Sequence, residues 1–399
     1  MKVLIADKFP EYYVEKIKGL GLEVYYDAKL SEETLPAAVK GYDILIVRST
    51  VVSEATVLAS DKLSLIIRAG AGINTINIAA ANKRGIYVTN CPGKNSIAVA
   101  ELTLALITAI DRKIPDNVAD FKAGKWNKGV YSKAEGLYGK TLGIVGTGQI
   151  GQEVINRALS FGMRVIAWSR SLTPEKATEL GVVRASDLQE LFSLSDIVSV
   201  HLAQNSATKG LINAGLLSLL KKGSVFINTS RAGIVDETAL IELLKSGKIS
   251  VGLDVFNNEP EGKDGQVNSE LSSLPNVYVT HHIGASTEQA QNAVAEETYL
   301  IIHDYIKLGN VRNWVNRCPT SSATHQLIVR HYDKPGVLSK VLGFLSGEGI
   351  NVQEIENVIF DGQETACCTI KLELEPSAAV INNLNTLHDE VIDVSLIKL

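Results

Sequence analysis

The chain has 399 residues, of which 45% are hydrophobic and 21% are charged, and this length and composition predict two or three ordinary globular domains. Its net charge of −5 excludes a general electrostatic attraction to nucleic acid or to an anionic membrane. Any anionic substrate must therefore be held by locally placed arginine and lysine side chains. The longest apolar helical stretch, around residues 100–110, contains Glu101 and is too short to span a membrane.

The four cysteines, Cys91, Cys318, Cys367 and Cys368, show neither a C-x-x-C spacing nor a pattern of metal ligands. We interpret the chain as reduced and without a metal site, because disulfides are rare in reducing compartments. The apolar run that begins at Met1 is too short for a signal peptide and continues directly into a predicted strand. We therefore expect a soluble, cytoplasmic protein.

The first ninety residues alternate apolar runs with amphipathic segments, which is typical of an α/β unit with a parallel sheet. Strands are predicted at residues 2–6, 23–26, 43–47, 65–68 and 86–89, and helices at residues 11–20 and 32–39. This part lacks a G-x-G-x-x-G motif, so we interpret it as a companion domain and not as a second nucleotide site. A long helical pattern at residues 94–112, which ends before Pro115, would connect two lobes.

A glycine-rich loop follows this helix. An apolar run at residues 141–145, typical of a buried parallel strand, precedes Gly146, Gly148 and Gly151, whose spacing is G-x-G-x-x-G. A helical pattern comes next, and a second strand is predicted at residues 164–168, as the dinucleotide-binding fingerprint requires. Further strands are predicted at residues 197–201, 224–229, 250–254 and 277–280. The positive end of the helix after the loop would favour a pyrophosphate anion.

The last part of the chain has a different pattern. A helix predicted at residues 287–308 should return to the first lobe, and residues 310–324 form the best linker because they are polar and non-periodic. Beyond it, strands are predicted at residues 326–331, 351–360, 364–374 and 391–398, and helices at residues 336–347 and 377–387. The order βαββαβ is that of a small ferredoxin-like domain.

Several motifs occur in the order found in one enzyme family. They are Arg68-Ala-Gly-Ala-Gly-Ile-Asn74, Asn95-Ser96 with Glu101, the loop from Gly146 to Gly151, Asn228-Thr-Ser-Arg-Ala-Gly-Ile-Val-Asp236, Asp254-Val-Phe-Asn-Asn-Glu-Pro260 and His282-Ile-Gly-Ala-Ser286. By these motifs residues 1–316 resemble the D-2-hydroxyacid dehydrogenase family. The tail, with His331-Tyr-Asp-Lys-Pro-Gly-Val-Leu338, looks like an ACT domain, a small ligand-sensing module.

The resemblance implies an α/β fold with three domains. Residues 1–93 and 286–312 would form a flavodoxin-like substrate-binding domain, and residues 94–285 a Rossmann dinucleotide-binding domain. Residues 313–323 would form a linker, and residues 324–399 a ferredoxin-like ACT regulatory domain.

The implied reaction is NAD(P)-dependent oxidation of 3-phospho-D-glycerate to 3-phosphohydroxypyruvate, the first step of serine biosynthesis. The motifs carry over three catalytic residues. Arg231 would pair with the substrate carboxylate, His282 would exchange the hydroxyl proton, and Glu259 would orient His282 and raise its pKa. His281, where relatives commonly have proline, should point away from His282 because side chains alternate along a strand.

The resemblance also implies two sets of binding residues. The substrate side comprises Arg48, Ser49, Ala71, Gly72 and Asn95, with Arg48 at the position that contacts the substrate phosphate. The cofactor side comprises Gly146, Gly148, Gln149, Ile150, Gly151, Ser169, Arg170, Thr229, Ser230, Arg231, Asp254, His282 and Gly284. Asp254 matches a position that contacts the nicotinamide amide.

The form of the cofactor is left open by a departure from the family pattern. NAD-preferring relatives end the second strand with an aspartate that binds the ribose 2′-hydroxyl and repels a 2′-phosphate. Ser169 stands in its place, and Arg170 could pair with a phosphate. NAD(H) is favoured by the family, whereas NADP(H) is compatible with these two residues.

The tail resembles serine-sensing ACT domains at His331, Asp333 and Asn351, which we take as candidate effector-binding residues. Asp333 departs from the asparagine of those domains, because a carboxylate cannot donate a hydrogen bond to a ligand carboxylate. Feedback by serine and sensing of another small amino acid are both compatible with this tail. The resemblance implies a homodimer through the dinucleotide domain, or a homotetramer through paired tails.

Two other functions stay open. The first is a glyoxylate/hydroxypyruvate reductase of the same family, which Ser169 and Arg170 favour and Arg48 and the tail do not. The second is a non-catalytic regulator that senses a dinucleotide, against which the joint presence of Arg231, Glu259 and His282 argues.

Overall fold

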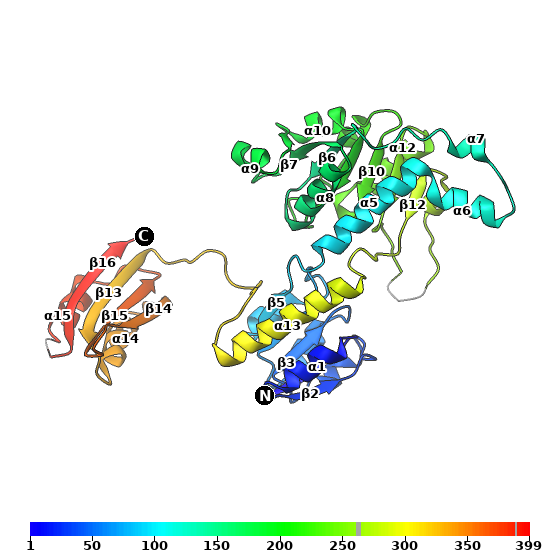
Figure 1. The fold of residues 1–399 in the computed structure, drawn as a ribbon. Coiled ribbons are helices and arrows are strands. Elements are labelled where there is room, and N and C mark those ends of the chain that lie inside the picture. Colours follow the sequence, from blue (N-terminus) through cyan, green and yellow to red (C-terminus); the bar gives the residue numbers. More distant parts are fainter. Residues whose placement is uncertain (261–264, 388) are drawn as a thin grey trace. The chain divides into compact units, whose positions relative to one another are not determined.

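The computed structural model describes residues 1–260, 265–387 and 389–399. The chain divides into two compact units, Met1–Asn316 and Arg317–Leu399. The larger unit contains two parallel sheets and the smaller one contains an antiparallel sheet (Figure 1).

The first sheet of the larger unit has five parallel strands in the order β2-β1-β3-β4-β5. Its strands are β1 (Lys2–Ile5), β2 (Glu23–Tyr26), β3 (Ile44–Val47), β4 (Leu65–Arg68) and β5 (Tyr87–Asn90). The helices around it are α1 (Glu11–Lys18), α2 (Leu35–Ala38), α3 (Glu54–Ala59) and α4 (Ile78–Lys83). All four residues of β3 are buried, because each face of the sheet packs against its own hydrophobic cluster.

The second sheet has seven parallel strands in the order β12-β11-β10-β9-β6-β7-β8. They are β6 (Thr141–Val145), β7 (Arg164–Trp168), β8 (Val183–Arg184), β9 (Ile197–Val200), β10 (Val225–Asn228), β11 (Ser250–Leu253) and β12 (Val277–Val279). The helices are α8 (Gln149–Ser160), α9 (Pro174–Glu179), α10 (Leu188–Leu194), α11 (Ala214–Ser218) and α12 (Glu237–Lys245), with 3-10 turns η1 (Ala232–Ile234) and η2 (Glu270–Ser273). The strand order reverses direction at β6, between β7 and β9, and ligands of doubly wound sheets bind beside such a point.

Two long helices join the parts of the larger unit. The first, α5 (Ser96–Arg112), packs its apolar face, including Leu104 and Ile107, into the core of the second sheet. The second, α13 (Glu288–Lys307), places Ile301 and Ile302 in the core of the first sheet. The predicted return of this helix to the first lobe is therefore confirmed.

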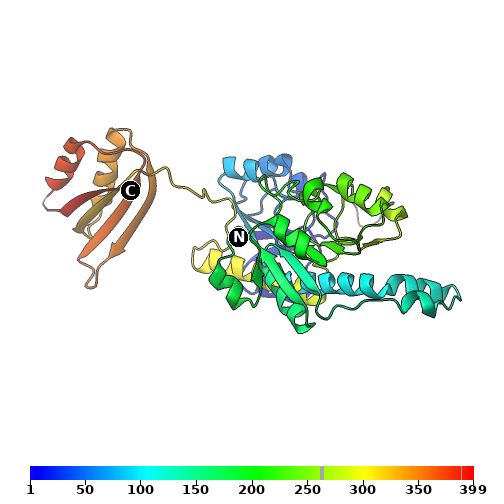
Figure 2. The same cartoon turned by 90° about the horizontal axis from the view of Figure 1, so that it is seen from above.

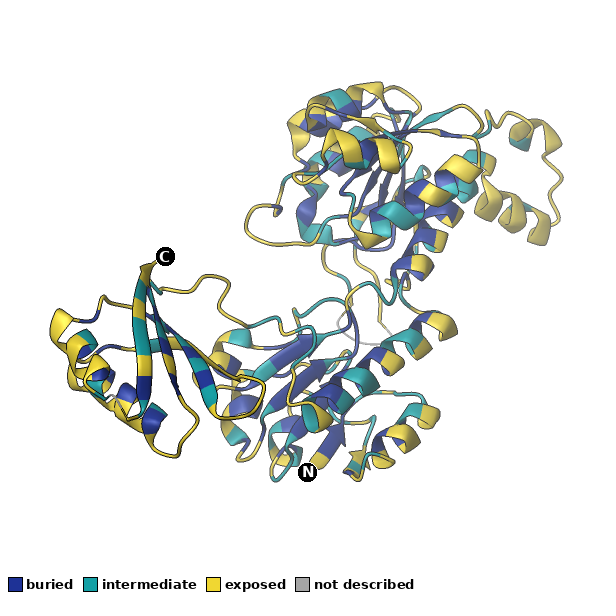
Figure 3. Cartoon of the chain, turned by 60° about the vertical axis from the view of Figure 1, so that its left-hand side comes forward, coloured by how far each residue is buried: buried dark blue, intermediate teal, exposed yellow. Residues whose placement is uncertain are grey.

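Two short helices between α5 and β6 were not predicted from the sequence. Lys113 has a φ of 48°, which ends α5, and Pro115 then lies in the first turn of α6 (Ile114–Lys122). The second of the two helices, α7 (Lys128–Tyr131), follows. Neither α6 nor α7 has a buried residue, and this part of the chain is drawn almost entirely as exposed or intermediate in Figure 3.

The segment after α13 lies against the edge of the first sheet. Trp314 forms an antiparallel bridge with Thr89, and the backbone N–H of Val315 donates to the carbonyl of Val88 over 2.9 Å. The side chain of Asn316 accepts from the N–H of Val88 at 2.8 Å. This exit segment therefore covers β5 before the second unit begins.

The smaller unit has its elements in the order β13 (His325–Tyr332), α14 (Val337–Gly347), β14 (Val352–Ile359), β15 (Thr365–Leu372), α15 (Ala378–Asn385) and β16 (Val391–Lys398). Its four strands are antiparallel in the order β14-β15-β13-β16. Both helices pack on one face of the sheet, where Val341 and Leu384 join the core (Figure 2). Within the described residues, no helix has the length and apolar character needed to cross a membrane.

Candidate active site

The predicted site residues of the second sheet lie in loops that follow the carboxyl ends of its strands. Gly146 follows β6, Ser169 follows β7, Thr229 follows β10 and Asp254 follows β11. Because parallel strands end at one edge of the sheet, these loops share that edge with the β6 switch point.

The glycine loop has the geometry that its spacing predicts. Gly146 has a φ of 101°, and a Cβ there would lie 2.4 Å from the carbonyl oxygen of His201. A Cβ at Gly151 would lie 2.0 Å from the carbonyl oxygen of Gly146, so the third glycine lets the helix approach the strand. Gly148 faces open space and begins α8 without a side-chain cap. The first N–H groups of α8 are thus available to an anion such as a pyrophosphate.

A pocket of about 350 Å³ lies beside this loop, and Gly146, Gly148, Trp168, Ser169, Arg170 and His201 are among its lining residues. His201 is 9% exposed and its Nε2 lies 2.8 Å from Ser199 Oγ. Burial lowers the pKa of His201 to about 3, so the ring is neutral at physiological pH. Its Nδ1 has no hydrogen-bond partner among the described residues. The room and the polar atoms of the pocket fit a nucleotide.

His282 and Glu259 form a hydrogen-bonded pair. His282 Nδ1 lies 2.7 Å from Glu259 Oε2, and the hydrogen bond raises the pKa of His282 while partial burial opposes the rise. For Glu259, burial raises the pKa, but the bond and charge of His282 outweigh it and the pKa is lowered on balance. The pair therefore holds its proton on the imidazole more firmly than a free histidine would.

The loop that carries His282 is held by Asp254, which is 2% exposed. The carboxylate of Asp254 accepts from Thr280 Oγ1 at 2.6 Å, from the N–H of Ile283 at 2.8 Å and from the N–H of Gly284 at 2.8 Å. A Cβ at Gly284 would lie 2.9 Å from Asp254 Oδ2, so a larger residue at this position would crowd the carboxylate. Asp254 thus positions the histidine loop, a role that the sequence did not indicate.

The reason given for separating His281 from His282 was wrong, because neither residue lies in a strand. Strand β12 ends at Val279, and His282 has a φ of 51°, in the left-handed region. His281 lines a different, apolar pocket with Phe256 and Leu271. The turn at His282, and not strand alternation, sets the direction of its side chain.

Arg231 follows β10 in a hydrogen-bonded turn. Asn228 Oδ1 accepts from the backbone N–H and the hydroxyl of Ser230 at 3.0 and 2.7 Å, and Asn228 Nδ2 donates to the carbonyl of Arg231 at 3.0 Å. The neighbouring Thr229 Oγ1 lies 3.0 Å from Thr103 Oγ1 on α5. A Cβ at Gly72 would lie 2.8 Å from Arg231 Nη2. The structure therefore brings Gly72 and Arg231 together, from different sheets.

Arg68, at the end of β4, belongs with this group although we did not single it out from the sequence. It is mostly buried, and its Nε has no hydrogen-bond partner among the described residues. Burial, followed by the charges of Arg231 and Arg48, lowers the pKa of Arg68 to about 10. Arg48, Arg68 and Arg231, at the ends of β3, β4 and β10, therefore form a cationic cluster that is suited to binding an anion. The signal available in the sequence was the arginine that opens the Arg68–Asn74 motif.

The turn that begins at Arg48 is held by the side chain of Asp7. The backbone N–H groups of Arg48, Ser49 and Thr50 all donate to Asp7 Oδ2, at 2.6, 2.9 and 2.9 Å. These backbone donors, Ser49 included, are therefore engaged within the protein, and the Arg48 side chain is what remains for an external anion.

The loop after β5 carries Asn95. The side-chain Oδ1 of Asn95 is buried without a partner among the described residues, which marks it as a candidate ligand contact. Gly93 has a φ of 73°, and a Cβ there would lie 1.8 Å from Gln149 Oε1. The predicted substrate residue Ala71 accepts from Asn90 Nδ2 at 2.6 Å through its carbonyl. This loop thus contacts the cofactor-side residue Gln149.

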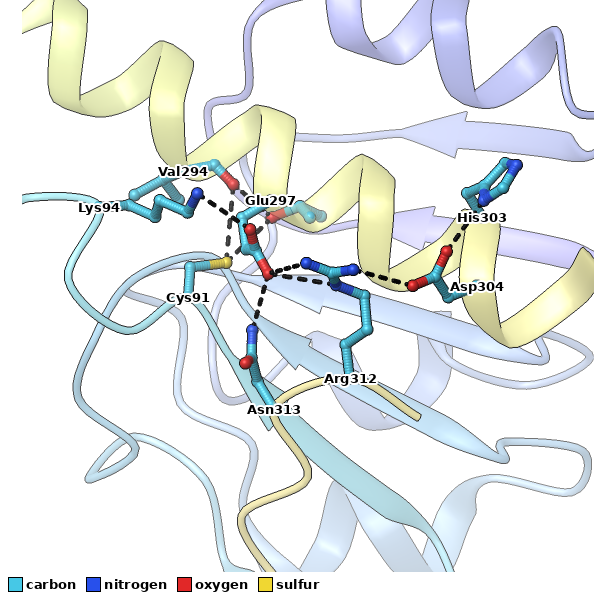
Figure 4. Close-up of polar contacts among 9 residues, drawn as sticks. Cys91, Lys94, Val294, Glu297, His303, Asp304, Arg312 and Asn313 are labelled. Carbon is cyan, nitrogen blue, oxygen red and sulfur yellow. Dashed lines mark hydrogen bonds and ion pairs between the residues drawn. The ribbon is translucent and has the colours of Figure 1, made fainter. Parts of the chain in front are cut away.

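A cluster of charged side chains, centred on the buried Glu297, lies next to the same loop (Figure 4). Glu297 of α13 is 4% exposed and pairs with Lys94 Nζ at 3.1 Å. Its Oε1 accepts from Asn313 Nδ2 at 2.8 Å and lies 3.4 Å from Arg312 Nε. Arg312 also pairs with Asp304 at 3.0 Å. One carboxylate therefore links the Asn95 loop, α13 and the exit segment.

The candidate effector residues of the smaller unit are not joined by hydrogen bonds. His331 is 1% exposed, with Nδ1 at 2.8 Å from the carbonyl of Tyr332 and Nε2 at 3.0 Å from Asn357 Oδ1. The side chains of Asp333 and Asn351 are exposed. Asn357, on β14, is the partner of His331 that the sequence did not indicate. Within the described parts of the chain, no group of three or more potential ligands is placed to hold a metal ion.

A family model and the curated proteins that resemble this chain indicate the same enzyme family. Residues 104–284 match the family described as D-isomer specific 2-hydroxyacid dehydrogenase, NAD binding domain. The chain is 40% identical over 295 residues to D-3-phosphoglycerate dehydrogenase of Methanocaldococcus jannaschii, covering 73% of this chain and 55% of that protein. The chain spans about 55–60% of the length of the curated relatives it matches.

Solved structures give the same relationship. An acyclic imino acid reductase in complex with NADPH and D-Arg is 30% identical, with a TM-score of 0.70 over 79% of this chain and 100% of that one. An NAD+-bound 3-phosphoglycerate dehydrogenase of Entamoeba histolytica is 28% identical, with a TM-score of 0.66 over 79% of this chain and 99% of that one.

Proposed function

This chain belongs to the D-isomer specific 2-hydroxyacid dehydrogenase family, and we propose that it is a D-3-phosphoglycerate dehydrogenase, which oxidises 3-phospho-D-glycerate to 3-phosphohydroxypyruvate. The reaction would be the first step of serine biosynthesis. The observation that carries the catalytic part is the 2.7 Å pair of His282 and Glu259, with Arg231 close enough to perturb the pKa of both.

The three side chains have complementary roles. His282 uses Nδ1 for Glu259, so its Nε2 is the nitrogen that accepts the hydroxyl proton of the substrate and returns it in the reverse direction. Glu259 stabilises the imidazolium that results. Arg231 binds the substrate carboxylate and polarises the carbonyl oxygen as it develops. A bound nicotinamide cofactor supplies the hydride acceptor.

The cationic cluster of Arg48, Arg68 and Arg231 favours a substrate that carries two anionic groups. A 2-hydroxy acid alone brings one carboxylate, which Arg231 would hold. Arg68, with an unpartnered Nε, and Arg48 remain for a phosphate, and arginine binds phosphate oxygens in pairs. This favours phosphoglycerate over glyoxylate or hydroxypyruvate, which carry no phosphate.

The cofactor is NAD(H), held by the NAD-binding domain at residues 104–284. We assign the pyrophosphate to Gly148 and the N–H groups of Gln149, Ile150 and Gly151, which α8 leaves without side-chain caps. Thr229, Ser230, Asp254 and Gly284 would then border the nicotinamide half.

The smaller unit would act as an ACT regulatory domain that binds serine or another small amino acid. Its βαββαβ order and antiparallel sheet are those of ferredoxin-like domains. His331 Nε2 already forms a hydrogen bond with Asn357. His331 could bind a ligand through this atom only if that hydrogen bond were broken. The exposed Asp333 and Asn351 would contact the ligand directly.

We expect the protein to assemble as a homodimer or homotetramer. Support comes from the apolar side chains around α6 and α7, since Phe121 is 69% exposed, Trp126 81% and Tyr138 89%. Aromatic side chains this exposed, close together in the chain, are typical of a surface that another copy covers.

Two alternatives differ in a measurable way. A glyoxylate/hydroxypyruvate reductase is favoured by Ser169 and Arg170, because reductases of this family often use NADPH. A non-catalytic dinucleotide sensor would bind cofactor without turnover.

The test is a turnover assay of the full chain with phosphohydroxypyruvate, hydroxypyruvate and glyoxylate, each with NADH and NADPH. We expect phosphohydroxypyruvate to have the highest kcat/KM and His282→Asn to abolish turnover while leaving cofactor binding intact. A higher kcat/KM for hydroxypyruvate or glyoxylate would establish the reductase instead. Cofactor binding without any oxidation would establish the sensor.

A further inference from the structure

We propose that Glu297 is a positioning residue for the substrate site, which holds the loop of residues 91–95 through Lys94 and thereby fixes the place of Asn95. The inference rests on the proposed function, because it requires that Asn95 contacts the substrate. It goes beyond that function by giving a role to α13, a helix that carries none of the proposed catalytic or binding residues.

The side chain of Asn95 is free to meet a ligand, although its backbone occupies a capping position. Asn95 is the N-cap residue of α5, where an asparagine oxygen normally accepts from a backbone N–H of the first turn. Here the side chain makes no such bond, and its Oδ1 is buried without a partner among the described residues. The amide can present its oxygen or, after a half turn, its NH2 group to a ligand. Its position therefore depends on how the loop is held.

Two residues of the loop are tied to one face of α13 (Figure 4). Cys91 Sγ lies 3.6 Å from the carbonyl oxygen of Val294 and 3.5 Å from Thr298 Oγ1. Lys94 Nζ lies 3.1 Å from Glu297 Oε2. The three helical residues are three and four positions apart, so they share a face of the helix. Because thiol hydrogen bonds are weak, the ion pair of Lys94 and Glu297 is the stronger of the two ties.

Glu297 is a fixed anchor for this tie. It is 4% exposed, and its Oε1 accepts from Asn313 Nδ2 at 2.8 Å and lies 3.4 Å from Arg312 Nε. Burial raises the pKa of Glu297, but its hydrogen bonds to Lys94 and Asn313 outweigh burial, and the pKa is lowered on balance. The carboxylate is therefore ionised at physiological pH. One of its oxygens meets the exit segment, and the other meets the loop.

The chain between Lys94 and the start of α5 transmits this anchoring to Asn95. The backbone N–H and the hydroxyl of Ser96 donate to the carbonyl of Gly93 at 3.0 and 2.6 Å. The N–H of Val99 donates to the carbonyl of Asn95 at 3.1 Å. Residues 93–96 thus form a closed turn, so a displacement of Lys94 also displaces Asn95. A shift of about 1 Å is enough to lose a hydrogen bond to the substrate.

The first experiment measures affinity for the substrate and leaves the buried anchor in place. The dissociation constant of 3-phospho-D-glycerate is measured by calorimetry on the full-length protein with NADH bound, at constant ionic strength because salt screens exposed charges. We expect Lys94→Met to raise this constant about tenfold, and Lys94→Arg, which restores the ion pair, to recover most of the loss. The dissociation constant of NADH should stay the same. Unchanged affinity for 3-phospho-D-glycerate in Lys94→Met would overturn the proposal.

Two further variants separate positioning from a direct contact between Lys94 and the substrate. In an Asn95→Ala background, Lys94→Met should cause no further loss, because the group that Lys94 positions is gone. Glu297→Gln weakens the ion pair and leaves Lys94 charged, so it should also weaken binding of 3-phospho-D-glycerate. Additive losses in the double variant, or unchanged or tighter binding in Glu297→Gln, would show that Lys94 contacts the substrate itself and would reject the positioning role.

The matched control is Lys221→Met. Lys221 Nζ pairs with Asp196 at 2.8 Å, and its side chain is 43% exposed, against 37% for Lys94. Asp196 precedes β9, so this pair lies at the amino end of the strands, away from the loops of the site. Lys221→Met changes the net charge equally, and affinity for 3-phospho-D-glycerate should stay unchanged. If it weakens binding as much as Lys94→Met does, the effect comes from net charge and the proposal fails.

A second experiment measures turnover with phosphohydroxypyruvate and NADH. We expect KM for phosphohydroxypyruvate to rise about tenfold in Lys94→Met with little change in kcat, because Asn95 binds the substrate and takes no part in proton exchange. Unchanged kinetics together with unchanged affinity would reject the inference and leave the proposed function intact. Weaker binding of 3-phospho-D-glycerate in Lys94→Met, without turnover of any keto acid by the unaltered protein, would reject the proposed function and leave the positioning role intact.

Discussion

The Nδ1 atom of His282 lies 2.7 Å from Oε2 of Glu259, and this bond raises the pKa of His282. A histidine with a raised pKa stays protonated to higher pH, which favours the proton donation that we propose for it during reduction. The same bond occupies Nδ1 and leaves Nε2 for the substrate. In the proposed mechanism, the pair therefore favours the protonated ring and leaves Nε2 as the atom that exchanges the proton.

The pH dependence of reduction follows from this bond. With phosphohydroxypyruvate and NADH, kcat/KM should be constant at low pH and fall as pH rises through a midpoint above 6.5, the ordinary value for histidine. Glu259→Gln removes the main cause of the raised pKa and leaves burial, which lowers it, so the midpoint should move to lower pH. Glu242→Gln, at an exposed position of α12, serves as the control. An unmoved midpoint in Glu259→Gln would show that another group limits the profile.

Asp254 should act on the reaction by positioning the histidine loop. Asp254→Ala removes three hydrogen bonds to Thr280, Ile283 and Gly284, and a displacement of about 1 Å at a catalytic group costs up to roughly a hundredfold in rate. We expect kcat for phosphohydroxypyruvate to fall between about tenfold and a hundredfold, with a smaller change in KM. Asp254→Asn, which keeps one carbonyl acceptor, should recover part of the loss. A KM effect without a kcat effect would contradict a positioning role.

Arg68 should select for the phosphate of the substrate. Arg68→Met keeps much of the buried side-chain volume but removes the charge, and KM for phosphohydroxypyruvate should rise by about ten- to a hundredfold. KM for hydroxypyruvate, which lacks the phosphate, should change little. Lys83→Met, at an exposed position of α4, removes the same charge elsewhere in the lobe and should alter neither. Equal losses for both substrates in Arg68→Met would mean that Arg68 holds the carboxylate or the fold instead.

Glu297 should stabilise the larger unit through its buried cluster. Glu297→Ala removes the carboxylate that Lys94 and Arg312 share, and both cations are more than a third exposed. Water can therefore solvate them, and we expect a loss of about 1–3 kcal/mol in the free energy of unfolding. Urea denaturation followed by circular dichroism measures this loss. The control is Glu153→Ala, because the Glu153–Arg157 ion pair is partly exposed and contributes at most about 1 kcal/mol to stability.

The pH dependence of this stability has a definite sign. Burial raises the pKa of Glu297, but its bonds to Lys94 and Asn313 outweigh burial and lower the pKa below the ordinary 4.5. The stabilisation is therefore present above that value and is lost as pH falls through the lowered pKa. The difference between the unaltered protein and Glu297→Ala should shrink in acid, and a constant difference would contradict this account.

Much of the fold was predictable because the central strands of the two parallel sheets, such as β3 and β9, are short apolar runs buried on both faces. The predicted strand at residues 43–47 and the observed β3, Ile44–Val47, differ by one residue. The glycine loop was predictable because each glycine answers a local steric demand. Helices α6 and α7 escaped prediction because α6 has no buried residue, so no apolar periodicity toward this chain's core marks it.

The site was harder to derive because its key contacts join distant segments. Nothing near Arg48 in the sequence indicates that Asp7 accepts three of the neighbouring N–H groups. Likewise, Asn357 as the partner of His331 depends on the pairing of β13, β14 and β15, and Asp254 bonds to a loop about thirty residues later. Spacing rules describe one element at a time, whereas these partners are set by tertiary packing.

The exit segment at residues 312–316 has a consequence for any shortening of this protein. Because Val315 and Asn316 bond to β5 and Arg312 and Asn313 bond to Glu297, this segment is structurally the outermost layer of the first sheet. A chain cut after Asn316 would keep that layer and a closed sheet edge. A chain cut after Leu308 would lose it. The outer edge of β5 would then be exposed, and Glu297 would keep Lys94 as its partner but lose Arg312 and Asn313.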